Sequence, residues 1–376
     1  MRDLLAHANL ARYAGQFVWL ELSYDEPQNR EFLNKYGAKA TPTFFVIDPR
    51  RETVAAMQTG VMSLPELNGF LDRGASVVLA SEQTPADAAL TRGDALLAEQ
   101  PAEAARAYQQ ALQLAPVDWP QRELAEASLV AALQAGKQAQ QCVESAAGYA
   151  AGMKRDVLFV RTVVSGMWCL AGGATAPWAD TKLRTMLTLS EEVLSLPITV
   201  RDHRDSIYRT LMLISVARKE NADMLKWSAR WLSELDATKP RSDEDRTALD
   251  IARVENIQIA GDPSRILPAL QASEKAMPNN YVASMRLAEM EVAAKQYDEA
   301  IASCRRGLRR SPGAVGKFWL FKIEADAFEA KGQKTEVRQA LQEALRAAEQ
   351  IPGQQSRERS ISAVKKALES DGNQPR

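Results

Sequence analysis

Side chains able to do redox, metal or acid–base chemistry are sparse in this chain of 376 residues. There are three cysteines, Cys142, Cys169 and Cys304, and two histidines, His7 and His203. The cysteines form neither a Cys-x-x-Cys pair nor an even disulfide framework, so we expect three small, buried, hydrophobic side chains. Neither histidine has cysteine or carboxylate neighbours at metal-ligand spacing. We therefore expect both at the surface, and we predict no metal, no cofactor and no catalytic residue.

Motifs that bind phosphate or activate a nucleophile are also missing. The sequence has no glycine-rich phosphate loop, no Gly-x-Ser-x-Gly and no His-Glu-x-x-His. A net charge of −1, from 47 basic and 48 acidic residues, gives no global field for nucleic acid or anionic lipid. The longest apolar stretches, such as residues 157–170, are too short to span a bilayer. These features predict a soluble protein without a nucleic-acid partner and without membrane insertion.

The elements that would position any site differ before and after about residue 80. Ala, Leu, Gln, Glu and Arg are abundant after it, which favours close-packed helices. The first 76 residues have a mixed α/β texture. The run Phe17–Ser23 is apolar on both faces apart from Glu21, as expected of an interior strand. The other expected elements are helices at Asp3–Tyr13 and Asn29–Tyr36, a hairpin of Thr43–Asp48 with Glu52–Gln58, and a helix from Ser63 to Asp72.

This order of elements, with the Thr41-Pro42-Thr43 step, resembles the later two-thirds of the thioredoxin fold. The resemblance implies that Thr41 and Pro42 form a cis-proline step that contacts a bound extended peptide. From the residues alone, a trans proline that starts a strand is favoured. The family's chemistry also needs a Cys-x-x-Cys at the start of the helix at Asp3–Tyr13, yet no thiol precedes Cys142.

Two explanations of the incomplete fold stay open. Either Met1 is an internal methionine of a longer reading frame, which we favour, or the two strands flanking the missing one have closed up on each other. The first explanation leaves an alternative function, a thiol-disulfide oxidoreductase whose Cys-x-x-Cys lies upstream of Met1. We expect a cytoplasmic location if Met1 is the true start, and a periplasmic or exported one if a leader was lost.

From residue 85, helix pairs recur with a period near 34 residues and resemble the tetratricopeptide family. The clearest copy contains Leu287, Ala288, Tyr297, Ala300, Gly307, Leu308 and Pro312. Other copies carry Gly261 with Pro278, Phe321, Ala325, Phe328, Gly332 and Ala344, and earlier Gly93, Ala104, Tyr108 and Ala111. Small residues are expected where the two helices of a pair approach most closely. The sequence thus predicts an α/β thioredoxin-like partial domain (1–76), an all-α tetratricopeptide-repeat superhelix or α-solenoid (85–354), and a capping helix (356–370).

Stacked repeats form a concave surface lined by first helices, and we predict that a peptide or protein partner binds there. Its expected lining is Met285, Glu289 and Val292 in one unit and Lys322, Asp326 and Glu329 in the next. Family members that clamp a terminal carboxylate need Asn where Glu289 and Asp326 stand, so we exclude that clamp. The arginines at 305, 306, 309 and 310 are interpreted as a solvated outer face. The leading hypothesis is a non-catalytic interaction scaffold with a redox-inactive thioredoxin-like segment, and self-association is a weaker option.

Overall fold

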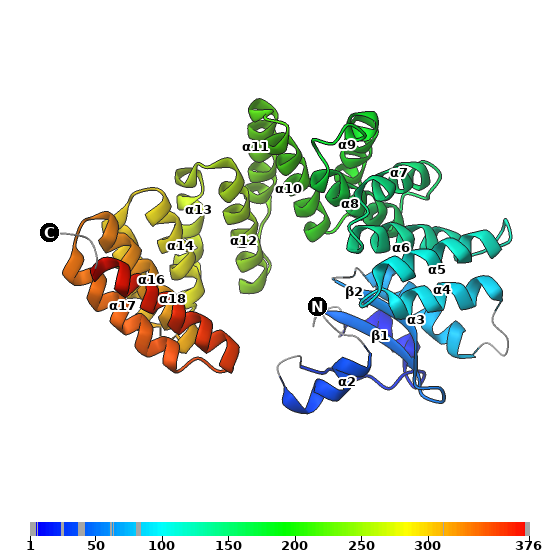
Figure 1. The fold of residues 1–376 in the computed structure, drawn as a ribbon, viewed down its shortest axis with the longest axis horizontal. Helices are drawn as coiled ribbons and strands as arrows, with labels where there is room; N and C mark the ends of the chain where they lie inside the picture. The colour runs from blue at the N-terminus through cyan, green and yellow to red at the C-terminus, as the bar shows by residue number, and fades with distance from the viewer. Residues whose placement is uncertain are drawn as a thin grey trace. The chain divides into compact units, whose positions relative to one another are not determined.

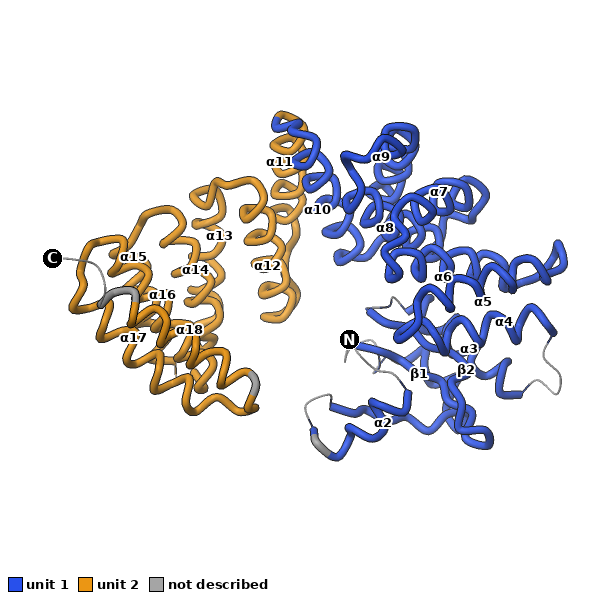
Figure 2. Tube along the Cα trace, in the orientation of Figure 1, with its two compact units in different colours: residues 1–221 blue, residues 222–376 orange. Residues whose placement is uncertain are grey.

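The computed structural model describes residues 5, 7–23, 26–36, 42–60, 62, 64–79, 84–310 and 312–372. These residues are mostly helical (Figure 1). The chain divides into two compact units, Met1–Asn221 and Ala222–Arg376 (Figure 2). This division falls inside the predicted helical array. The predicted domain boundaries near residues 76, 85, 354 and 356 stay predictions.

Unit 1 begins with short elements of mixed type. They are η1 (Ala8–Tyr13), η2 (Pro27–Asn29), α2 (Arg30–Lys35), β1 (Thr43–Asp48), β2 (Thr53–Thr59) and α3 (Leu64–Leu79). β1 and β2 pair antiparallel, as predicted, and Asp48 Oδ1 holds their turn by accepting a 2.8 Å hydrogen bond from the Arg50 backbone N–H. Leu67 and Phe70 of α3 are buried in the core cluster that covers this sheet. The expected helix at Asn29–Tyr36 is confirmed, whereas the expected start at Asp3 and the Ser63 cap lie outside the described residues.

The interior strand predicted at Phe17–Ser23 is wrong. This segment has no regular secondary structure, and Val18 and Leu20 are 88% and 72% exposed. An apolar run becomes an interior strand only if a neighbour satisfies its backbone N–H and C=O groups. Within the described ranges the sheet contains β1 and β2 alone, so no ladder joins this segment to β1. The described residues show a two-stranded sheet with a covering helix, and the thioredoxin-like fold stays a prediction.

The rest of unit 1 is a run of helix pairs. Its helices are α4 (Pro85–Leu96), α5 (Pro101–Leu114), α6 (Arg122–Ala135), α7 (Ala139–Ala150), α8 (Val157–Gly172), α9 (Ala179–Ser195) and α10 (Arg201–Ala217). Thr84 caps α4 and Asp156 caps α8, each through a side-chain oxygen that accepts a backbone N–H of the first turn. α8 also contacts α6 and α10, so first helices of successive pairs lie side by side. The predicted paired arrangement holds for α4 with α5, α6 with α7 and α8 with α9.

Unit 2 continues the same pattern. Its elements are α11 (Asn221–Ala237), α12 (Asp243–Ala260), η3 (Pro263–Arg265), α13 (Leu267–Ala276), α14 (Tyr281–Ala293), α15 (Tyr297–Arg309), α16 (Ala314–Ala330), α17 (Lys334–Glu349) and α18 (Gln354–Gly372). α14 contacts both its partner α15 and the next first helix, α16. Val364 of α18 is 1% exposed and packs on the last helix pair, with Ile361 and Leu368 partly buried beside it. The helix expected at 356–370 lies within α18, whereas its role as a cap stays a prediction.

One turn geometry recurs between the helices of several pairs. Lys137, Lys219, Lys295 and Gly332 each adopt a positive φ, between 56° and 72°. In each turn the next residue's backbone N–H donates to a carbonyl five residues earlier, for example Gln296 to Glu291 at 2.8 Å. This is the Schellman arrangement, in which glycine is the favoured residue. Three lysines therefore occupy the conformation that the sequence pattern associates with glycine.

Small residues lie where helices of a pair meet, as predicted. A Cβ on Gly93 of α4 would be 2.5 Å from the Tyr108 ring of its partner α5. One on Gly307 of α15 would be 3.2 Å from Ser284 of its partner α14 and 2.9 Å from Leu320 of the next helix, α16. Ala300 is fully buried in the same way. Any larger side chain at these positions would push the helices apart.

The prediction that all three cysteines are free is wrong for two of them. Cys142 of α7 and Cys169 of α8 form a disulfide with a Cα–Cα distance of 6.2 Å. The two residues are 27 apart in sequence, and only the packing of α7 on α8 brings them together. All three cysteines are buried, as expected, and burial raises the pKa of the free Cys304 thiol.

Candidate functional site

The six residues of the predicted binding surface lie on α14 and α16, two first helices in contact within unit 2. Glu289, Asp326 and Glu329 are exposed, and Met285, Val292 and Lys322 are half-buried. On each helix the three residues are spaced four and three apart, which places them on one helix face. The six positions therefore lie on one accessible helix face each, on first helices that contact one another. That a partner binds there stays a prediction.

Charges on this surface are unevenly paired. Lys322 Nζ lies 3.3 Å from Asp326 Oδ2 on the same helix. Glu289 has no hydrogen bond or ion pair among the described residues. Partial desolvation by its neighbours raises the pKa of its carboxyl, although the charge of Arg286 opposes the shift. Glu329 is exposed, and within the described ranges its side chain likewise makes no hydrogen bond or ion pair. The surface therefore carries two acidic groups without a close counter-charge.

Sequence reasoning missed two apolar residues in the same row. Val315 and Trp319 of α16 are 45% and 47% exposed, and they precede Lys322 at the helical spacing that continues its face. The Trp319 ring meets Phe318 edge-on, with ring centroids 5.0 Å apart, while its other side remains open to solvent. Extending the predicted row upstream by one turn would have found Trp319. We call the surface formed by the six predicted residues with Val315 and Trp319 the α14–α16 face.

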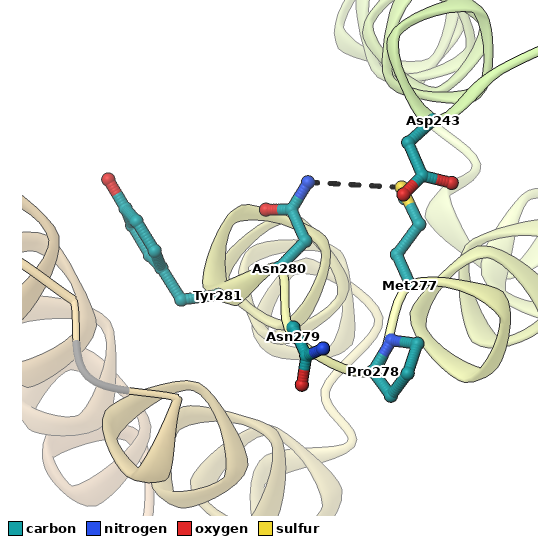
Figure 3. Close-up of a pocket in the computed structure, with 6 residues that line it drawn as sticks. All are labelled: Asp243, Met277, Pro278, Asn279, Asn280 and Tyr281. Carbon is teal, nitrogen blue, oxygen red and sulfur yellow. Dashed lines mark hydrogen bonds between the residues drawn. The ribbon is translucent and has the colours of Figure 1, made fainter.

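A pocket of about 390 Å³ lies at the turn between α13 and α14 (Figure 3). It is lined by Asp243, Met277, Pro278, Asn279, Asn280 and Tyr281. Asn280 Nδ2 donates to Met277 Sδ at 3.8 Å, and Asn280 Oδ1 accepts the Val282 backbone N–H at 2.9 Å, which caps α14. Figure 3 shows the Met277 side chain reaching toward Asp243, while the Tyr281 ring lies away from both. The polar groups of this pocket thus hold the turn together.

Two of the four arginines of α15, Arg305 and Arg309, are exposed as the sequence suggested, whereas Arg306 and Arg310 are half-buried. Arg306 makes a bidentate contact with Glu274, with Nε and Nη2 at 3.0 and 2.9 Å from its two oxygens. Arg305 pairs with Glu324 at 3.1 Å, and Arg310 donates to the Asn280 backbone carbonyl at 2.9 Å. Burial opposes ionisation of Glu274, but the hydrogen bonds from Arg306 and Ser284 outweigh it and lower the pKa. These arginines link helices, because their carboxylate partners need a counter-charge when buried.

Unit 1 gathers ionisable side chains from several helices. Glu66 and Arg73 lie on α3, Asp94 on α4, Arg161 on α8 and His203 on α10. Their charges act on one another, since Arg161 influences Arg73, Asp94 and His203, and Glu66 influences Arg161 and His203. We call these five residues the unit 1 charge cluster. Surface placement, expected for both histidines, is confirmed for His7 and wrong for His203, which is half-buried.

Burial controls the ionisation of this cluster. It raises the pKa of Asp94 to about 6, although a hydrogen bond from Tyr108 and the charge of Arg73 pull it down. It lowers the pKa of Arg73, Arg161 and His203, because desolvation penalises their charged forms. Two arginines, one histidine and two carboxylates thus lie in a shielded environment in one unit.

The other predicted site residues and the metal prediction have simpler outcomes. Pro42 is half-buried, and its carbonyl accepts the Gly60 N–H at 2.9 Å, while Thr41 lies outside the described residues. The peptide-binding role of Thr41 and Pro42 stays a prediction. Across the described part of the chain, no three His, Cys, Asp or Glu side chains gather as metal ligands would. Among the described helices, none combines the length and apolarity needed to cross a membrane.

Comparisons with known proteins add a structural likeness. No family model matches the chain, and no curated protein matches it. Among solved structures, it is similar to a tetratricopeptide repeat protein from Parabacteroides merdae, with a TM-score of 0.41 and 9% sequence identity. The match covers 75% of this chain and 100% of that chain.

Proposed function

We propose that the protein is a non-catalytic interaction scaffold of tetratricopeptide type that binds a peptide or protein partner on the α14–α16 face. The observation that carries this proposal is the exposed Trp319 in line with Glu289 and Glu329 on neighbouring first helices. A half-exposed aromatic side chain beside acidic groups is typical of the residues that anchor a protein–protein interface. A redox-inactive thioredoxin-like segment before the array belongs to the same proposal.

The chemistry of this face suggests the partner's composition. Glu289 and Glu329 lack close counter-charges, whereas Lys322 is already paired with Asp326. A segment with an apolar side chain that packs on Trp319 and with Lys or Arg beside it would supply what the face lacks. We therefore propose an extended peptide with basic residues flanking an apolar anchor.

Selection from a random peptide library on the immobilised full chain tests this. The selected peptides should be basic with a central apolar residue, and Trp319→Ala should weaken their binding by about 10-fold or more, since aromatic anchors dominate interfaces. Leu225→Ala is the matched control, because Leu225 is an exposed apolar residue of α11, 51% exposed. Glu289→Gln with Glu329→Gln should reduce affinity for the basic peptides at low salt and less at high salt.

Peptides that bind all these variants with wild-type affinity would contradict the proposal. The affinity of the double variant Glu289→Ala with Lys322→Ala for the same peptides is a second test, which changes one residue on each helix. An unchanged affinity in that variant would place the binding surface outside the α14–α16 face.

A further inference from the structure

We propose that two copies of the chain associate by reciprocal strand pairing, in which residues Phe17–Ser23 of each copy pair with the open edge of β1 in the other. Both elements belong to unit 1, so this interface is separate from the α14–α16 face. The pairing is reciprocal because each copy supplies one unpaired segment and one unpaired sheet edge. Self-association, which the sequence leaves open, thereby acquires defined residues.

The segment Phe17–Ser23 is uncovered. Val18, Leu20 and Leu22 alternate along it and all three are exposed, Val18 to 88%. Within the described ranges, no backbone N–H or C=O group of residues 17–22 forms a hydrogen bond. No other exposed large apolar side chains of the described residues are adjacent in sequence. The segment is therefore rich in strand-forming residues, with neither its backbone nor its side chains protected from a second chain.

Contacts within the same copy hold both ends of this segment. The Phe17 ring meets the Tyr13 ring edge-on, with centroids 5.9 Å apart, and the Tyr13 hydroxyl lies 3.0 Å from the Asn68 carbonyl oxygen of α3. At the other end, the Ser23 carbonyl accepts a 2.8 Å hydrogen bond from Asn29 Nδ2. The residues between these anchors are therefore available to a second chain without unfolding of the first.

β1 has an open edge on the side away from β2. The Gly60 N–H donates to the Pro42 carbonyl at 2.9 Å, so Pro42 and Gly60 form a hydrogen-bonded pair at the end of the antiparallel ladder. Because such pairs alternate with pairs that lack hydrogen bonds, the N–H and C=O groups of Phe45 and Ile47 point away from β2. No described residue bonds these groups, and β1 and β2 are the only strands of the described sheet. They are the groups that an added strand would bind.

Both faces of β1 are covered by helices, which decides the composition of a strand that can join it. On one face the Phe44 ring meets Phe70 of α3, with ring centroids 6.4 Å apart. On the other face the Phe45 ring meets Phe32 of α2, also with centroids 6.4 Å apart. A strand that lies between two covering layers needs apolar side chains on both of its faces.

The chain itself contains a segment of this composition. Phe17–Ser23 is apolar on both faces apart from Glu21, and its seven residues are about as long as the six-residue β1. Neither this segment nor residues 44–47 contain Lys or Pro, the residues that commonly protect an open edge. Every copy carries both the exposed segment and the edge that it fits. A second copy is therefore the occupant that these observations favour.

Sedimentation equilibrium of the full chain over a range of concentrations tests the proposal. Two short strand pairs bury less than about 1,200 Å², so we expect a dimer with a dissociation constant of about 10 µM. Val18→Lys places a charge on the pairing strand and should raise this constant at least about 10-fold. Val18 is exposed in the single chain, so the variant should fold. Val117→Lys is the matched control, because Val117 is also an exposed valine of unit 1, and it should leave the constant unchanged.

Residue-resolved hydrogen exchange of the same samples identifies the strands. The amides of residues 17–23 and those of Phe45 and Ile47 should become protected as the concentration rises, and Val18→Lys should lose both effects. A monomer at every concentration, or equal weakening by Val18→Lys and Val117→Lys, would overturn the proposal. Protection of residues 17–23 without Phe45 and Ile47 would show that the segment pairs with its own copy or another partner instead of β1, and would also overturn it. So would protection that does not depend on concentration.

Discussion

The Tyr108 hydroxyl of α5 donates a 2.7 Å hydrogen bond to Asp94 Oδ1 of α4, at the point where Gly93 lets the tyrosine ring lie against the helix backbone. The first helix pair is therefore joined by a polar contact next to a close apolar one. Tyr108 is fully buried, and burial raises the pKa of its hydroxyl well above the usual value, which keeps it a donor. This contact leads to two of the following predictions.

Asp94→Asn should stabilise unit 1 at neutral and alkaline pH. Burial raises the Asp94 pKa from 3.8 to about 6, so the folded state binds a proton more tightly than the unfolded state. Above about pH 6 the ionised carboxylate therefore lowers the free energy of unfolding, by at most about 3 kcal/mol. As pH falls toward 3.8 the cost disappears, and the variant should lose its advantage.

Urea unfolding of wild type and Asp94→Asn at about pH 4, 6 and 8 measures this difference. The exposed Asp118→Asn is the matched control in the same unit. A stability advantage of Asp94→Asn that grows toward low pH would contradict the assignment.

Gly93→Ala and Gly148→Ala should have opposite effects although both glycines lie in helices. A Cβ on Gly93 would lie 2.5 Å from the Tyr108 ring, whereas nothing lies within 4 Å of one on Gly148. We expect Gly93→Ala to lower the free energy of unfolding by about 1–3 kcal/mol through overpacking. Gly148→Ala should raise it by about 0.5–1 kcal/mol, because alanine has the higher helix propensity. Equal effects in thermal and urea unfolding would refute the close α4–α5 approach.

The disulfide predicts the number of reactive thiols. Protein purified under oxidising conditions and unfolded in denaturant should react with a thiol reagent at Cys304 alone, and at all three cysteines after reduction. Disulfides persist in oxidising compartments and are rare in the cytosol, so material from a reducing cytosol should show three thiols. Three thiols in material from an oxidising compartment would contradict the cross-link.

Cys142→Ala with Cys169→Ala should destabilise the protein by about 3–4 kcal/mol, because the cross-link closes a loop of some 27 residues in the unfolded chain. Cys304→Ala is the control that removes a buried thiol without a cross-link. Under reducing conditions wild type and Cys304→Ala also lose the cross-link. The lower stability of the double variant relative to these two proteins should then vanish. A difference that persists under reducing conditions would assign the effect to packing.

Lys295→Gly should stabilise unit 2 by about 1 kcal/mol. Lys295 has a φ of 62°, a conformation that costs an L-residue with a side chain roughly this amount and glycine almost nothing. Lys317→Gly, within α16, should instead cost about 1 kcal/mol by helix propensity. Chemical unfolding of both variants checks the pair, and a loss of stability in Lys295→Gly would show that its side chain matters more than its backbone.

The sequence predicted the helices well because their ends are marked locally. Helix periodicity with recurring glycine and proline predicted paired helices from residue 85 onward, and the described residues contain them from α4 to α17. The strand at Phe17–Ser23 failed because its apolarity is a local property, whereas a partner strand is not. The recurring turn could be predicted only at Gly332, because glycine is the residue expected at a positive φ. Lysine at positions 137, 219 and 295 gives no such signal, although it adopts the same backbone conformation.

The candidate sites divide in the same way. The α14–α16 face could be read from the repeat spacing, and Trp319 was within reach of the same reasoning. The unit 1 charge cluster could not, because Arg73, Arg161 and His203 come from helices distant in sequence. The Cys142–Cys169 bond was missed for the same reason, since a spacing of 27 residues does not reveal which helices pack together.

The same bond gives the helical array a mechanical property. If the chain is pulled from its ends, helix pairs held by packing alone can peel apart one after another. The segment between Cys142 and Cys169 cannot lengthen, because force passes through the sulfur bridge instead of the 27 residues that it spans. About 90 Å of contour, at some 3.4 Å per residue, is thereby withheld from extension until the bridge is reduced. In this region of unit 1, redox state sets how far the molecule can stretch.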